Sequence, residues 1–175
     1  DMMAATQFEP IGPFEIPFDK GTRRIEKEHI RSFFENKDIQ KKIDLLNTRG
    51  CYIFALRAGK GFTPWYVGQA KKSFKQEIFA IHKKDIYNSV LANKMGTPMM
   101  FLIGTSKKNQ FLEKEIKDLE SFLIFWARKA NKGLKNQQNN KDTWGIAGVY
   151  NSDIGKPSTA SKNLKGLLNL EGKIK

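Results

Sequence analysis

The sequence predicts an α+β domain in which a small, three-stranded and mostly antiparallel sheet is flanked by helices. Three observations predict this class. Two apolar, strand-like runs, residues 51–56 and 63–67, are separated by a glycine-containing segment typical of a β-hairpin. Residues 98–104 have the composition of a buried strand, and residues 110–130 carry the apolar stripe of an amphipathic helix. The order strand, strand, helix, strand, helix suits a sheet covered by helices.

The chain before the hairpin is expected to form an extension, residues 1–49, that packs on the core. Residues 1–10 are predicted to be a loose terminus. Residues 14–18 alternate apolar and polar side chains as a short edge strand does, and proline is tolerated in such a strand. From Thr22 the apolar residues recur at helical spacing, and a second short helix is expected over residues 39–46.

A helix is also expected between the hairpin and the third strand, over residues 74–93, because apolar residues recur there every four positions. Residues 144–150 are expected to form a small extended element, so that the globular domain spans residues 50–150. Residues 151–175 are predicted to be a basic tail that is mobile or only partly ordered.

The chain is strongly basic, with 31 Lys and Arg against 18 Asp and Glu and a formal net charge of +13. Such an excess favours polyanion partners, because neutralising phosphates releases condensed counterions. The alternative is a basic surface that is incidental to function. No apolar run approaches the roughly 20 residues that cross a bilayer, and the first residues lack a signal-peptide pattern. We therefore expect an intracellular protein, cytoplasmic or in the nucleoid or nucleus, with no membrane partner.

Cysteine and histidine are scarce, which restricts the metals that the chain can bind. The single cysteine, Cys51, excludes an intrachain disulfide, and the only histidines are His29 and His82. Neither a zinc cluster nor a multi-histidine site is expected. Any metal is predicted to be a hard cation bound by oxygen, such as Mg²⁺ or Mn²⁺.

Glu120 is the best candidate for a metal ligand. On the long helix it lies beside the apolar face, next to Ile116, Leu123 and Ile124. A carboxylate flanked by core residues is costly unless it is paired or bound to a metal. The alternative is a glutamate at the edge of the core that is paired with a lysine.

Four further residues are candidates for contacts with a phosphate. Tyr52 and Tyr66 on the hairpin could place their hydroxyls near it, although a strand tyrosine more often packs in the core. His82 shares the partly apolar face of its helix, and Lys75, about two turns earlier, could point the same way. Such a pair could donate hydrogen bonds to a phosphate or orient a nucleophile. The alternative is a boundary histidine beside a surface lysine.

The tripeptides Gly50-Cys51-Tyr52 and Tyr66-Val67-Gly68 resemble the pair for which the GIY-YIG nuclease family is named. His82 falls near the helix histidine of that family. Glu120 fits its metal-binding glutamate, and Asn136 fits its downstream asparagine. The resemblance covers roughly half of the chain and implies a three-stranded antiparallel sheet with surrounding helices.

The resemblance further implies a metal-dependent endonuclease that hydrolyses phosphodiester bonds in DNA, which is favoured over RNA as the partner. In that comparison Tyr52 assists the general base and Tyr66 positions water or phosphate. Glu120 holds magnesium or manganese, while Gly68 and Asn136 support the site. The predicted catalytic set is Tyr52, Tyr66, Lys75, His82 and Glu120.

One position departs from the family. The arginine that the family carries on the first helix after the motif is missing from residues 74–78, where Lys75 is the candidate substitute and Glu77 lies near the expected place. Two alternatives to an endonuclease are therefore kept. They are a non-catalytic nucleic-acid-binding module on the same fold and a structural or protein-interaction domain.

Overall fold

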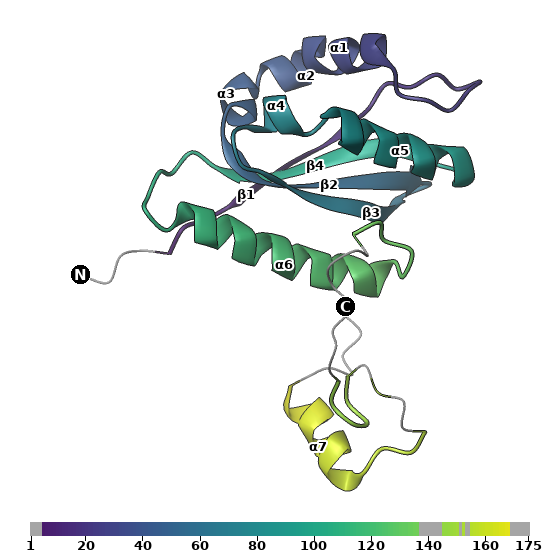
Figure 1. The fold of residues 1–175 in the computed structure, drawn as a ribbon, viewed down its shortest axis with the longest axis vertical. Coiled ribbons are helices and arrows are strands. Elements are labelled where there is room, and N and C mark those ends of the chain that lie inside the picture. Colours follow the sequence, from purple (N-terminus) through teal and green to yellow (C-terminus); the bar gives the residue numbers. More distant parts are fainter. Residues whose placement is uncertain (1–4, 137–144, 151, 153–154, 169–175) are drawn as a thin grey trace. The chain divides into compact units, whose positions relative to one another are not determined.

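The computed structural model describes residues 5–136, 145–150, 152 and 155–168. The chain divides into two compact units, Asp1–Asn136 and Gln137–Lys175. The first unit contains the sheet and most of the helices (Figure 1). Among the described helices, none combines the length and the apolar character that a membrane crossing requires.

The sheet has four strands, so the predicted three-stranded sheet is wrong, whereas the α+β class is confirmed. The strands lie in the order β1-β4-β2-β3, and all neighbouring pairs are antiparallel. Their bounds are β1 (Glu9–Glu15), β2 (Arg49–Ala58), β3 (Gly61–Ala70) and β4 (Thr97–Thr105).

The additional strand is β1, whose sequence lacks the regular alternation that predicts a strand. It pairs with β4 at the edge of the sheet, with an irregularity between Ile11 and Phe14. Gly12, at this irregularity, has a φ of 100°, and Pro13 follows it. Glycine and proline within a short strand interrupt the alternation that predicts a strand. The alternating pattern therefore pointed to residues 14–18, although pairing begins at Glu9.

Strands β2 and β3 form the predicted hairpin, but they run further than the sequence indicated. Ala58 pairs with Gly61, which leaves a turn of only Gly59 and Lys60. Gly59 has a φ of 58°, which glycine adopts at no steric cost.

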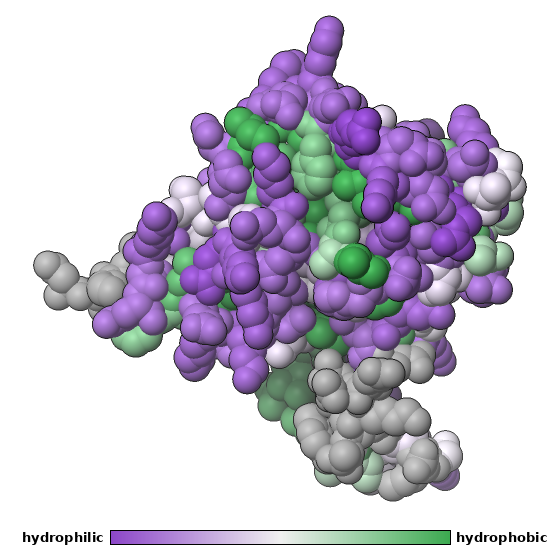
Figure 2. Space-filling view, turned by 45° about the horizontal axis from the view of Figure 1, so that its top comes forward, coloured by the Kyte–Doolittle hydropathy of each residue, from purple (hydrophilic) through white to green (hydrophobic). Residues whose placement is uncertain are grey.

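Helices cover both faces of the sheet (Figure 1). One face is covered by α1 (Lys27–Glu35), α2 (Lys37–Gln40), α3 (Ile43–Leu46), α4 (Phe74–Glu77) and α5 (Ile81–Asn93), and the other by α6 (Leu112–Ala130). Successive side chains of β2 point alternately toward the two faces of the sheet. Tyr52 and Phe54 join the main core under α1–α5, whereas Cys51 and Ile53 pack with clusters under α6. The outer surface over α1–α5 is largely hydrophilic (Figure 2).

The helix predicted over residues 74–93 is in fact two helices, α4 and α5. Ser73 caps α4 by accepting a hydrogen bond from the Gln76 backbone N–H (3.3 Å). The break at Phe79 and Ala80 lets the Phe79 ring pack edge-on against Phe33, with ring centroids 5.1 Å apart. Aromatic packing thus overrides the continuous helical pattern. The helix expected over residues 39–46 is likewise divided, into α2 and α3.

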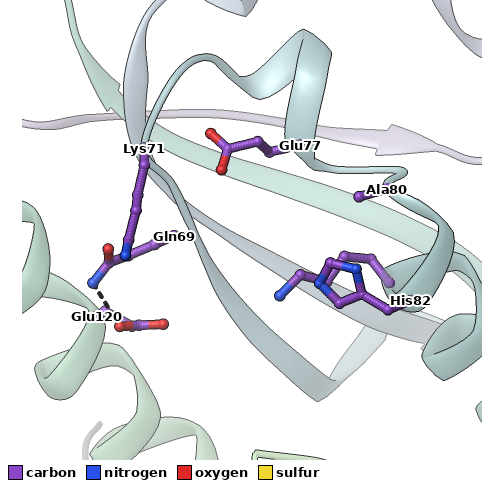
Figure 3. A pocket seen from close by; sticks show the side chains of 7 residues that line it. Gln69, Lys71, Glu77, Ala80, His82 and Glu120 are labelled. Carbon is purple, nitrogen blue, oxygen red and sulfur yellow. Dashed lines mark hydrogen bonds between the residues drawn. The ribbon is translucent and has the colours of Figure 1, made fainter.

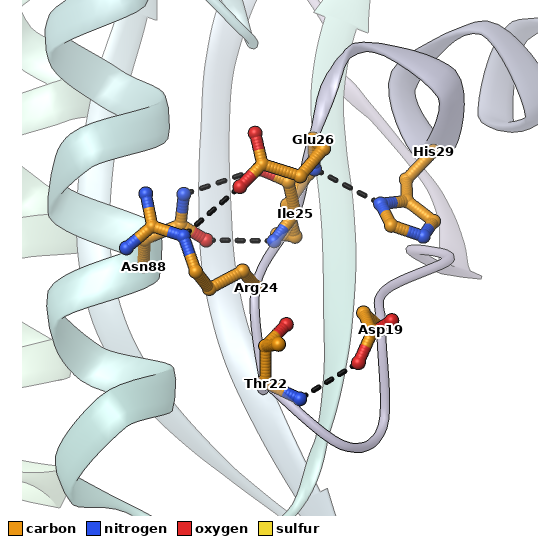
Figure 4. A network of polar contacts seen from close by, with 7 residues as sticks. All are labelled: Asp19, Thr22, Arg24, Ile25, Glu26, His29 and Asn88. Atoms are coloured by element: carbon orange, nitrogen blue, oxygen red, sulfur yellow. Dashed lines mark hydrogen bonds and ion pairs between the residues drawn. The ribbon is translucent and has the colours of Figure 1, made fainter.

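A loop segment before α1 holds α5 in place (Figure 4). The Oδ1 atom of buried Asn88 accepts from the Ile25 backbone N–H (2.8 Å), and its Nδ2 donates to the Ile25 carbonyl (3.1 Å). Arg23 donates to the carbonyl oxygens of Leu91, Lys94 and Gly96 at the carboxyl end of α5. These contacts fix the position of α5 and hence of its first turn.

The second unit contains α7 (Thr159–Leu167) and an isolated bridge between Ile146 and Tyr150. The helix lies in the region predicted to be a mobile or partly ordered tail. Trp144, at the start of the predicted extended element, and residues 169–175 of the predicted tail lie outside the described residues.

Candidate functional site

An open hollow of about 410 Å³ is lined by side chains from β3, α4, α5 and α6 and from the segments beside them (Figure 3). Its residues come from distant parts of the sequence, and they combine lysines and a histidine with two carboxylates and an amide. They are Gln69, Lys71, Glu77, Ala80, His82, Lys83 and Glu120. Two of the predicted site residues, His82 and Glu120, therefore meet at one hollow.

Glu120 is half-buried and hydrogen-bonded but not ion-paired. Its Oε2 atom accepts from the Nε2 atom of Gln69 on β3, at 2.7 Å. Among the described residues, none forms a salt bridge with Glu120. The alternative of a glutamate paired with a lysine is therefore not what the described residues show. Oε1 stays available to a ligand that enters the hollow.

Tyr66 is linked to the hollow through Lys83. The Lys83 ammonium donates a hydrogen bond to the Tyr66 hydroxyl and lies 4.7 Å from the centroid of the tyrosine ring. Only 9% of the Tyr66 surface is exposed. Lys83 follows His82 in the first turn of α5. Lys83 was not among the residues predicted from the sequence, where its position next to His82 was the one available signal.

Tyr52 is fully buried behind this pair, with its ring centroid 6.3 Å from that of Tyr66. Its buried hydroxyl lies beside the Tyr87 hydroxyl, which donates a hydrogen bond to the Ile78 carbonyl (2.6 Å). Burial raises the pKa of the Tyr52 phenol far above its usual range, and Tyr66 and Glu77 raise it further. Tyr52 is therefore a neutral phenol at physiological pH, which can donate a proton to a hydrogen bond but cannot act as a base.

The glycines of both tripeptides are explained by packing. A Cβ atom on Gly68 would lie 2.3 Å from Cζ of Tyr52. A Cβ atom on Gly50 would lie 2.8 Å from the Cα atom of Gly104 and 2.9 Å from the ring of Phe74. No side chain fits at either position without displacing its neighbours. Gly68 thus makes room for the Tyr52 ring.

Like Tyr52, Tyr66 and Gly68, the last two predicted site residues do not line the hollow. Lys75 is exposed on α4. Asn136 instead binds the free edge of β3, where its Nδ2 donates to the Val67 carbonyl (2.6 Å) and its Oδ1 accepts from the Val67 N–H (2.8 Å). The Asn136 side chain thus pairs with the edge of β3 as a residue of a neighbouring strand would. Asn136 therefore fixes the strand segment that carries Tyr66 and Gly68.

Part of the lining of the hollow would favour an anion, although Glu77 and Glu120 face the same hollow. Lys71 and Lys83 supply positive charge, and α5 begins here at Ile81, after Ala80, whose side chain cannot cap the N–H groups of the first turn. These groups and the lysines would both favour an anion. The exposed His82 imidazole can take or give a proton.

The residues also fit one hard cation. Among the described residues, no group of three or more His, Cys, Asp or Glu side chains is placed to hold a metal. Magnesium does not need such a cage, because it keeps several waters and is bound through one or two carboxylates together with substrate phosphates. Glu120, one of whose oxygens has no partner among the described residues, lies at a hollow also lined by Lys71 and Lys83 and fits that mode.

No family model, curated protein or solved structure matches this chain.

Proposed function

We propose that the chain is a metal-dependent endonuclease that hydrolyses phosphodiester bonds in DNA. The observation that carries the proposal is the meeting of Glu120, His82 and the Lys83–Tyr66 pair at one open hollow. The net charge of +13 supports a polyanionic partner. The resemblance of the two hairpin tripeptides to those of GIY-YIG nucleases supports the same reaction, and the chain would be a divergent member of that family.

Residues at the hollow would have separate roles in the reaction. Lys71 and Lys83 would bind the phosphate, together with the N–H groups at the start of α5. Because the Tyr66 oxygen accepts a hydrogen bond from Lys83, its own proton is directed elsewhere and could go to a phosphate oxygen or the attacking water. His82 would accept a proton from that water as the water oxygen bonds to phosphorus and the bond to the leaving oxygen breaks, and the leaving oxygen would take its proton from solvent water. Glu120 would hold one Mg²⁺ or Mn²⁺ ion, which polarises the phosphate as a Lewis acid.

The second candidate is a non-catalytic nucleic-acid-binding module on the same scaffold. Two observations favour it. One carboxylate oxygen of Glu120 already accepts a hydrogen bond from Gln69, and the arginine that GIY-YIG nucleases carry is absent from residues 74–78. Such a module would use the same lysines without cleaving its ligand.

One assay separates the two candidates. The purified chain is incubated with supercoiled plasmid in Mg²⁺, in Mn²⁺ and in EDTA, and its affinity for a duplex is measured in EDTA at several salt concentrations. An endonuclease relaxes or linearises the plasmid only with a divalent metal. A binding module gives salt-sensitive affinity without cleavage in any metal. If the chain neither cleaves the plasmid nor binds the duplex, the remaining candidate is a structural or protein-interaction domain.

A further inference from the structure

The outer face of α6 carries a cluster of three aromatic rings and a lysine, here called the α6 patch: Phe122, Phe125, Trp126 and Lys129. Phe122 is 59% exposed and Trp126 is 40% exposed. The Trp126 ring contacts Phe122 and Phe125 edge-on, with centroids 6.4 and 5.5 Å away. The Lys129 ammonium lies 4.8 Å from the Phe125 centroid and 5.1 Å from that of Trp126.

The α6 patch is separate from the hollow that contains Glu120. The side of α6 that packs on the sheet is marked by its buried residues, Leu112, Ile116, Ile124 and Ala127. At about 100° per residue, Phe122, Phe125 and Lys129 lie on roughly the opposite side of the helix, and Trp126 lies about a quarter turn from the buried side. They are therefore not part of the core or of the proposed catalytic site, and large exposed rings of this kind mark an interaction surface.

The charges around the α6 patch indicate its partner. Residues 121–136 contain no Asp or Glu and carry four basic side chains, Arg128, Lys129, Lys132 and Lys135, and the acid one turn before Phe122, Asp118, is already paired with Lys114 (2.6 Å). A second copy of the chain would bring like charges together, which disfavours self-association. An anionic partner with flat apolar faces would suit both the exposed rings and the positive charge. Nucleic-acid bases stack on aromatic rings, and the phosphates contact the lysines.

We propose that the α6 patch is a stacking platform for unpaired bases of a single-stranded nucleic-acid segment. The inference rests on the proposed nucleic-acid partner, but it does not depend on cleavage. It assigns Trp126 and Phe122 the contact with bases and Lys129 the contact with the adjoining phosphate. Duplex DNA, whose bases are already stacked, would use this surface much less.

The test measures the affinity of the full chain for a fluorescent single-stranded thymidine oligonucleotide, in EDTA so that no cleavage occurs. Trp126→Ala is expected to weaken binding about tenfold, in the range of one lost base stack. Lys129→Gln is expected to weaken it and to reduce its salt dependence. Phe111→Ala is the matched control, since Phe111 is 52% exposed at the start of the same helix, and it should bind as the unmodified chain does. Circular dichroism checks that each variant is folded.

Unchanged oligonucleotide affinity in Trp126→Ala would overturn the inference. If the same variant also abolished a dimer seen by sedimentation, the α6 patch would be a protein interface instead. The nuclease proposal is tested independently, because a chain that fails to cleave plasmid can still show the Trp126-dependent affinity. Equally, loss of that dependence leaves a metal-dependent cleavage intact.

Discussion

The ring of Tyr52 lies against Gly68 on the neighbouring strand, where a Cβ atom would come within 2.3 Å of the tyrosine Cζ. The two residues are direct partners in the β2–β3 ladder. The tyrosine of the first tripeptide and the glycine of the second therefore form one packing unit. Their pairing has a structural cause, whatever chemistry the nearby hollow performs.

Gly68→Ala should destabilise the protein because the added methyl group overlaps the Tyr52 ring. We expect the free energy of unfolding to fall by about 1–3 kcal/mol, as for other overpacked cores. Urea denaturation followed by circular dichroism measures it. The control is Gly61→Ala, whose Cβ would meet nothing nearer than 3.8 Å. Equal urea midpoints for the two variants would show that Tyr52 moves aside without cost.

Asn88→Ala should loosen α5. The substitution leaves both the N–H and the carbonyl of Ile25 without their side-chain partner in a buried position. Each of the two unsatisfied buried groups costs about 1–3 kcal/mol, so a loss of roughly 2–6 kcal/mol in unfolding free energy is expected. Asn93→Ala removes one exposed hydrogen bond from the same helix and should cost less than about 0.5 kcal/mol. Similar losses in both variants would contradict the assigned role of Asn88.

Stability should fall at alkaline pH. Burial raises the pKa values of the Cys51 thiol and of the Tyr52 and Tyr87 phenols in the folded chain. Above about pH 10 the unfolded chain releases protons that the folded chain retains, so the free energy of unfolding decreases as pH rises, by about 1.4 kcal/mol per pH unit and group.

Tyr52→Phe removes one of these groups together with a buried hydroxyl that lies beside the Tyr87 hydroxyl. Its unfolding free energy at neutral pH should change by no more than about 1.5 kcal/mol, the net value of one hydrogen bond. Between about pH 10.5 and about pH 11.5, its decline should be shallower by about 1.4 kcal/mol per pH unit. Urea titrations at a series of pH values measure both slopes. Parallel slopes would mean that Tyr52 ionises as readily in the folded chain as in the unfolded one.

Lys83, and not Lys75, should be the basic group on which cleavage depends. Lys83 contacts Tyr66 and lines the hollow, whereas Lys75 is exposed on α4 and does not line it. Lys83→Ala should slow plasmid cleavage about a hundredfold, as loss of a transition-state donor does, and Lys83→Arg should retain more activity. Lys75→Ala should cleave at nearly the original rate. The reverse order of effects would assign the role to Lys75.

The contrast between these lysines shows how far the sequence could predict the site. A continuous helix over residues 74–93 would place Lys75 and His82 on one face, but the break at Phe79 and Ala80 separates them. That break results from aromatic packing against Phe33, a tertiary contact that local spacing does not report. The reach of the long Lys83 side chain to Tyr66 is likewise a tertiary property.

The fold, like the site, could be predicted from the sequence only in part. The hairpin and α6 were predictable because each is long and strongly patterned, and α6 runs from Leu112 to Ala130 where residues 110–130 were expected. Strand β1 was not, because Gly12 and Pro13 interrupt its alternation and its pairing with β4 is a long-range contact. Glu120 was recognisable beside the apolar stripe of α6, but its hydrogen bond with Gln69 on β3 was not.

The most direct test of the proposed nuclease compares Glu120→Gln with Glu113→Gln in the Mg²⁺-dependent plasmid assay. The first variant removes the charge that would hold the metal while keeping an acceptor for Gln69. The second changes an exposed glutamate on the same helix. We expect Glu120→Gln to cleave at about a hundredth of the original rate or less and Glu113→Gln to cleave normally. Full Mg²⁺-dependent activity in Glu120→Gln would contradict the assignment of the metal site.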